Sequence, residues 1–300
     1  MTNARTVRTG RPTTLAPSEG ASTREQRIAT GASSWAYGLT AGLSAVMVVQ
    51  PVLGLLYATE YRDVEWIKAT WFGNDWVTLL LGAPILVLGT LTATRGSMRG
   101  QLVWLGMLGY AAYNYAFYTF GATLNRFFVL YVLGLVLAVV TLIVVLARFD
   151  TAGLAGAFGR RALVRLVSVY LMLVGTGLGV AWIALWAAYA FWELPTPVEQ
   201  ETFKLVAALD LALMVPALTC GGVLAWRRRP WGFVIATIAS LQASLYLVVL
   251  AVNAAVSIHR GLSEAPGELP LWTVLAVLTT TASVVLLVNI REPRRVSPCG

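Results

Sequence analysis

Residues 202–232 have the sequence TFKLVAALDLALMVPALTCGGVLAWRRRPWG, and this stretch decides the fold class. It is long and apolar enough for one helix across a bilayer, which requires about 20 such residues. The run ends in the basic sequence RRRP at 227–230, which is typical of a cytoplasmic membrane boundary. An acid, Asp210, lies inside the run, and Pro216 follows it by six residues. The sequence therefore predicts a membrane-spanning helix that carries a carboxyl group.

Asp210 stands out because a carboxylate at the centre of a spanning helix costs about 2.5–3.5 kcal/mol on insertion. Such a residue faces protein or water rather than lipid. Lys204 marks the predicted outer water boundary, so Asp210 lies roughly 9 Å below it at about 1.5 Å per residue. Two interpretations stay open. Asp210 either forms hydrogen bonds that hold helices together, or it binds a ligand, a proton or a cation.

The composition places the whole chain in the membrane class. Of its 300 residues, 58% are hydrophobic and 12% are charged, whereas about a quarter are charged in a soluble domain. A soluble fold is therefore excluded. The net charge of +8 does not indicate nucleic acid, because the basic residues flank apolar runs instead of forming a separate face. We expect the lipid bilayer as a partner and no nucleic acid.

Eight apolar stretches are separated by short connections that carry most of the charge. Each stretch has close to the roughly 20 residues needed to cross a bilayer. They cover 35–57, 76–94, 102–121, 127–147, 166–190, 204–226, 233–257 and 271–290. Residues 1–34 are polar and are predicted to form a disordered cytoplasmic tail, and 291–300 a second cytoplasmic tail. The sequence predicts an all-α integral membrane bundle of eight transmembrane helices.

The distribution of Arg and Lys predicts the orientation. If the N-terminus is cytoplasmic, the inner segments hold 17 basic residues and the outer segments hold 5. Every alternation then obeys the positive-inside rule. We therefore expect a multi-pass protein of the plasma membrane with both termini in the cytoplasm.

Several polar residues fall at a depth similar to that of Asp210. Tyr110, Asn114 and Tyr118 are four residues apart and form one stripe on the third predicted span. Gln50 and Asp75 lie near the outer ends of the first and second spans. Each has a structural interpretation, such as a helix start for Asp75 and an interfacial aromatic belt for the tyrosines. Together with Asp210, they are the candidate ligand-binding residues of a polar, aromatic-lined recess open to the extracytoplasmic side.

The second and sixth predicted spans resemble each other. Pro84 lies eleven residues before Arg95, and Pro216 lies eleven residues before Arg227. A parallel repeat of four helices plus four would place these spans in corresponding positions. Proline-interrupted helices at matching places are typical of transporter binding sites.

The residues for catalysis or metal binding are sparse. His259 is the single histidine, and the two cysteines, Cys220 and Cys299, are far apart in the chain. This excludes a bis-histidine haem and any zinc or iron–sulfur spacing. The spans contain no HExxH or GxSxG motif and no pair of catalytic acids. We predict no cofactor, no metal and no catalytic residue, and an enzyme is the least favoured class.

Three runs resemble a group of uncharacterised prokaryotic multi-pass membrane proteins. They are GNDWVTLLLGAPILVL, YAAYNYAFYTFGATLNRFFVLY, and LDLALMVP followed by WRRRPWG. The group has no known activity, so the resemblance implies the membrane class and assigns no functional residue. The sequence favours a protein that binds or transports a small molecule or ion. The alternative is a non-catalytic scaffold, sensor or accessory subunit with a partner membrane subunit.

Overall fold

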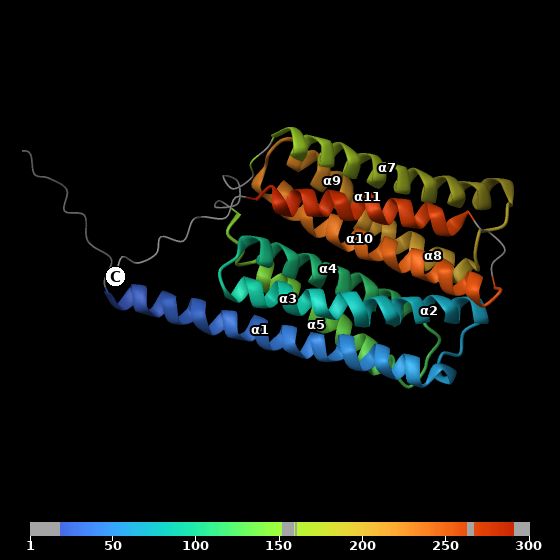
Figure 1. The fold of residues 1–300 in the computed structure, drawn as a ribbon, viewed down its shortest axis with the longest axis horizontal. Helices are drawn as coiled ribbons and strands as arrows, with labels where there is room; N and C mark the ends of the chain where they lie inside the picture. Colours follow the sequence, from blue (N-terminus) through green and yellow to red (C-terminus); the bar gives the residue numbers. More distant parts are fainter. Residues whose placement is uncertain (1–18, 152–158, 160, 263–266, 291–300) are drawn as a thin grey trace, which may run out of the picture.

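The computed structural model describes residues 19–151, 159, 161–262 and 267–290, and these form an assembly of helices that run side by side (Figure 1). The N-terminal bundle comprises α1 (Glu19–Leu56), the 3-10 turn η1 (Ala58–Glu60), α2 (Glu65–Val77), the π-helical segment η2 (Thr78–Gly82), α3 (Ala83–Thr94), α4 (Met98–Gly121) and α5 (Phe128–Leu146). The C-terminal bundle comprises α7 (Arg161–Trp192), α8 (Gln200–Leu209), the π-helical segment η3 (Asp210–Met214), α9 (Val215–Trp226), α10 (Pro230–His259) and α11 (Glu268–Val288). The predicted tail 291–300 and residues 1–18 lie outside the described residues.

Seven helical stretches among the described residues are long and apolar enough to cross a membrane, which supports the predicted membrane class. They correspond to seven of the eight predicted spans. The remaining one, 102–121, lies within α4 and is helical throughout, but it is not among the seven. Fifteen of the 24 residues of α4 are buried by other helices. A helix in this position presents little surface to lipid, so its sequence can carry the polar and aromatic run that lowers its hydropathy.

The first helix is longer than its predicted span. α1 begins at Glu19, fifteen residues before Ser34, whereas 1–34 was predicted to be disordered. The sequence of 19–33 contains Ala, Glu, Gln and Arg, which are good helix formers. Extending an existing helix costs less than nucleating a new one, so the spanning helix can continue into this polar segment.

The helices of each bundle form a closed ring of four. In the N-terminal bundle α1 packs on α2, α3 and α5, and α4 packs on α3 and α5. In the C-terminal bundle α9 packs on α7 and α10, and α11 packs on α10 and α7. The two bundles lie beside each other and meet mainly where α10 packs on α4 and on α2 (Figure 1).

The hairpin α3–α4 is repeated by the hairpin α9–α10 at an offset of 132 residues, the separation of the two prolines noted in the sequence. A Cβ atom added at Gly89 would lie 3.0 Å from the backbone N of Trp104. A Cβ atom at the equivalent Gly221 would lie 2.9 Å from the backbone N of Ala236, the equivalent of Trp104. The turns also match, because Gly96 and its equivalent Arg228 both have positive φ angles, 79° and 54°.

Contacts between the bundles are reciprocal, as a two-fold axis requires. A Cβ atom at Gly106 would lie 2.5 Å from Leu241, the equivalent of Gly109. A Cβ atom at Gly109 would lie 3.0 Å from Ile238, the equivalent of Gly106. In the same way, a Cβ atom at Gly73 would contact Asn253, the equivalent of Gly121. A Cβ atom at Gly121 would contact Leu205, the equivalent of Gly73. These pairs indicate an internal parallel repeat about an axis between α4 and α10, of the kind found in transporters built from two like halves.

The two π-helical segments occupy equivalent places in this repeat. Thr78 begins the first and Asp210 begins the second, 132 residues later, and each segment ends two residues before a proline. Proline lacks the backbone N–H that would continue the α-helical hydrogen bonds. The turn before it can therefore take up the wider i→i+5 spacing of a π-helix. Single-turn π segments are frequent at functional sites. Asp210 is therefore held at an irregular point of its helix.

Candidate functional site

Asp75 is the centre of a fully buried hydrogen-bonded group, which we call the Asp75 cluster (Gln50, Tyr61, Asp75 and Tyr118). Oδ2 of Asp75 accepts a hydrogen bond from the Tyr61 hydroxyl at 2.6 Å. Oδ1 accepts from the Tyr118 hydroxyl at 2.8 Å and from Gln50 Nε2 at 3.0 Å. None of the four side chains is more than 1% exposed. The cluster joins α1, α2, α4 and the connection between α1 and α2.

Tyr61 and Gly54 close this cluster. Tyr61 lies between the spanning segments, and burial raises the pKa of its hydroxyl, so the phenol keeps its proton and acts as a donor. A Cβ atom at Gly54 of α1 would collide with the Tyr61 hydroxyl and with Oδ2 of Asp75. Only glycine at position 54 lets α1 approach this closely. The arrangement is that of a packed structural junction between helices.

Tyr110 and Asn114 contact Thr78, which follows Asp75 by three residues in the same spanning segment. The hydroxyls of Tyr110 and Thr78 are 3.0 Å apart, and Asn114 Nδ2 donates to Thr78 Oγ1 at 3.3 Å. Thr78 is the first residue of η2, so both side chains secure the π-helical segment against α4. The stripe of Tyr110, Asn114 and Tyr118 therefore does lie on one face, and this face packs against the second span.

Asp210 lies apart from these residues, in the C-terminal bundle. Its Oδ1 accepts a hydrogen bond from the Tyr113 hydroxyl of α4 at 2.6 Å. Its Oδ2 accepts from Trp182 Nε1 of α7 at 2.9 Å. The carboxylate thus connects three helices, two in its own bundle and one in the other. Each oxygen receives one hydrogen bond and keeps a free lone pair.

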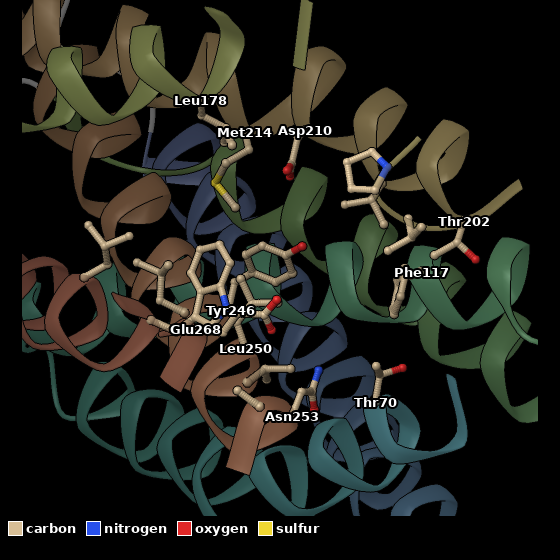
Figure 2. A pocket seen from close by; sticks show the side chains of 18 of the residues that line it. Thr70, Phe117, Leu178, Thr202, Asp210, Met214, Tyr246, Leu250, Asn253 and Glu268 are labelled. Carbon is tan, nitrogen blue, oxygen red and sulfur yellow. The ribbon is translucent and has the colours of Figure 1, made fainter. Parts of the chain in front are cut away.

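A cavity of about 940 Å³ borders Asp210. Figure 2 shows Asp210 and Met214 on one wall and Thr70 and Asn253 on the opposite side, with Tyr246 between them. The walls come from α7, α8, η3, α9, α10 and α11 of the C-terminal bundle and from α2 and α4 of the N-terminal bundle. The volume falls in the range of small-molecule sites, which hold about 300–1,000 Å³.

The lining is mostly apolar, with aromatic and acidic side chains. Six aromatic residues contribute to it: Trp66, Trp71, Phe117, Trp182, Tyr246 and Trp272. Three acids also line it, namely Asp210, Glu199 and Glu268. Among the described residues, its lining includes no Arg, Lys or His. The cavity thus has an acidic and aromatic character.

The cavity opens sideways between α7 and α11. Leu173 of α7 and Leu271 of α11 both line it, yet they are 66% and 52% exposed. A Cβ atom at Gly177, which also lines the cavity, would meet nothing within 4 Å. Below this opening, the hydroxyls of Tyr170 and Thr279 lie 2.5 Å apart and join the two helices. Both α7 and α11 are long and apolar enough to span a membrane, so an opening between them would face lipid if these helices are inserted.

The structure therefore divides the predicted site residues into two groups. Asp210 alone lines the cavity, whereas the other five candidates belong to the Asp75 cluster or secure Thr78. Sequence reasoning missed Tyr113 and Trp182 as partners of Asp210. Trp182 lies inside the fifth predicted span, 166–190, and Tyr113 lies just outside the predicted stripe. A tryptophan inside a span was the available signal for Trp182.

Three glycines of α7, at positions 175, 177 and 179, differ in their surroundings, and two of them pack closely against α9. Cβ atoms at Gly175 and Gly179 would contact α9, 2.6 Å from Thr219 Oγ1 and 3.1 Å from Val215 Cγ1. Gly177 faces the cavity instead. Close packing of α7 on α9 thus coexists with an open space on the next face of the same helix.

No family model matches the chain, and neither the curated proteins nor the solved structures give a match.

Proposed function

We propose that this protein binds a small, mainly apolar molecule within the membrane, in the cavity beside Asp210. The observation that carries the proposal is the cavity itself, about 940 Å³ in volume, apolar over most of its wall and open between the apolar helices α7 and α11. A molecule dissolved in the bilayer can reach it without crossing water. Asp210, Asn253 and Thr70 supply the few polar groups that orient a ligand in such sites.

We also propose that the chain crosses the plasma membrane eight times, with both termini in the cytoplasm. The seven apolar helices and the length of α4, 24 residues or roughly 36 Å at about 1.5 Å per residue, support eight crossings. The 17-to-5 division of basic residues supports the orientation. In this orientation the cavity belongs to the extracytoplasmic half of the membrane.

Photolabelling with benzophenone tests ligand binding, because this small neutral molecule needs only an apolar space. The protein in phosphatidylcholine nanodiscs would be irradiated with benzophenone, digested and analysed by mass spectrometry. We expect saturable labelling of peptides from α7, α8 and α11 that line the cavity.

Two substitutions on α7 give a matched pair. Gly177→Phe fills the cavity from a position with free space, and we expect it to lower the labelling severalfold. Val180→Phe adds a similar ring at a position that is 67% exposed and does not line the cavity, so labelling should persist. Labelling spread evenly over the lipid-facing surfaces, and equal in both variants, would overturn the proposal and favour a scaffold or accessory subunit.

A further inference from the structure

The cavity has an uncompensated negative character. The described ion pairs join Lys68 to Glu65, Arg126 to Glu60 and Lys204 to Glu201, and none of them involves Asp210. The partners of Asp210, Tyr113 and Trp182, are neutral donors. They stabilise a carboxylate but do not cancel its charge. A charge without a counter-ion is costly at membrane depth.

The aromatic lining complements this charge. A cation within about 6 Å of the face of Trp, Tyr or Phe is attracted by the ring, more strongly when water is excluded. Tyr246 and Trp182 line the cavity with Asp210, and Trp66 and Trp272 contribute further indole rings. Aromatic walls around an acid attract positively charged ligands and disfavour anions.

The acidic lining extends to the end of the molecule where α7 and α10 terminate. Glu199 precedes α8 and Glu268 begins α11, and both line the cavity and are exposed. A cation that approaches from this end therefore meets negative charge at Glu199 and Glu268 and again at Asp210. The apolar wall between them, formed by residues such as Leu178, Leu250 and Leu271, suits a hydrophobic body.

We infer that the ligand class of this cavity is a lipophilic cation, an apolar molecule with one positive charge that pairs with Asp210. This inference rests on the proposed function, because it specifies which small molecules the same cavity binds. The hydrophobic part occupies the space between α7, α10 and α11, and the charge lies near Asp210 among the aromatic rings.

The test uses two ions of the same shape and opposite charge. Binding of tetraphenylphosphonium and of tetraphenylborate to the protein in phosphatidylcholine nanodiscs would be measured separately by equilibrium dialysis, with empty nanodiscs subtracted. We expect tetraphenylphosphonium to bind at least about tenfold more tightly, since charge pairs near a protein surface are worth at least a factor of this order. Equal affinities, or tighter binding of tetraphenylborate, would overturn the inference.

Asp210→Asn keeps the shape of the side chain and removes its charge, and we expect it to abolish the preference for the cation. The control is Asp75→Asn, which removes the other intramembrane acid at a position outside the cavity and should leave the preference intact. An unchanged preference in Asp210→Asn, or its loss in Asp75→Asn alone, would contradict the assignment to Asp210.

A second variant covers the case in which Asp210→Asn does not fold. Val206 lines the cavity one turn before Asp210, so Val206→Lys places an ammonium group where it can pair with the carboxylate. It should remove the cation preference, while Val206→Leu should retain it. Benzophenone labelling separates the two proposals. Intact labelling without charge preference defeats the ligand class alone, whereas absent labelling defeats the site itself.

Discussion

Asp75 and Asp210 are both buried acids in the membrane-spanning part of the chain, and their surroundings give them different roles. Asp75 accepts three hydrogen bonds, and Gly54 allows α1 to close over it. Asp210 accepts two hydrogen bonds and borders a cavity. Asp75 therefore only joins helices, whereas Asp210 joins helices and also borders the space that we propose for a ligand. Of the two interpretations that the sequence left open for Asp210, its hydrogen bonds to Tyr113 and Trp182 fit the first, and ligand binding is our proposal.

We expect Asp75→Leu to destabilise the protein strongly, since it removes the acceptor of Tyr61, Tyr118 and Gln50 at once. Each orphaned buried donor costs about 1–3 kcal/mol, so the loss should reach about 3 kcal/mol or more. Tyr61→Phe removes one donor and should cost about 1 kcal/mol or less, as single hydrogen bonds do in a bilayer. Unfolding in mixed micelles, followed by tryptophan fluorescence, measures both. Similar losses for the two variants would show that the cluster is not the junction described.

The helix α5 has two distinct faces. Tyr131, Gly134, Ala138 and Thr141 follow three- and four-residue steps and are buried against α1 and α4. The opposite residues are exposed, including Val136 at 51%. The nearly continuous apolar sequence of α5 would suit a helix that faces lipid on all sides. The structure shows that this holds for one face only, while the buried face contributes to the ring.

Two substitutions two residues apart on α5 distinguish these faces. A Cβ atom at Gly134 would lie 2.7 Å from the ring of Tyr115, so Gly134→Ala should cost about 1–3 kcal/mol through overpacking. Val136→Leu changes an exposed position and should alter the free energy of unfolding by no more than about 0.5 kcal/mol. The same unfolding measurement applies to both. A larger effect at Val136 than at Gly134 would reverse our orientation of α5.

The molecule consists of two rings of four helices that are related by an internal two-fold axis, which runs between α4 and α10. The two cores differ in content. Tyr118 stacks on Trp71 and Tyr131 with ring centroids 4.9 and 5.0 Å apart. In the C-terminal bundle, the equivalent of Tyr118 is Leu250, which lines the cavity. Smaller side chains at repeated positions leave space in one bundle that aromatic rings fill in the other.

The orientation can be tested with epitope tags in intact cells. Because the basic residues divide 17 to 5, tags at either terminus should resist external protease, and a tag inserted near Gly261 should be cleaved. Permeabilised cells provide the control, since all three tags should then be cut. External cleavage of an N-terminal tag in intact cells would rule out this topology.

The sequence predicts what depends on local composition. Apolar runs near 20 residues place the spans, and the cost of an intramembrane acid identifies Asp210 as a residue that faces protein. Its partners could not be predicted, because Tyr113 lies 97 positions away and Trp182 lies 28 positions away, and either could have packed elsewhere. The proline spacing indicated the repeat, but only the reciprocal contacts across α4 and α10 establish its axis. The cavity depends on how side-chain volumes add up in space, which no single run of residues encodes.

The unequal cores of the repeat bear on binding stoichiometry. A protein built from two like halves could offer two equivalent sites, and occupancy of one could then influence the other. Here Leu247 and Leu250 border the cavity, whereas Tyr115 and Tyr118 occupy the equivalent positions as buried rings. The cavity beside Asp210 therefore has no twin of matching shape at those positions. One chain should saturate this cavity with a single molecule, giving a hyperbolic isotherm without cooperativity inside the monomer.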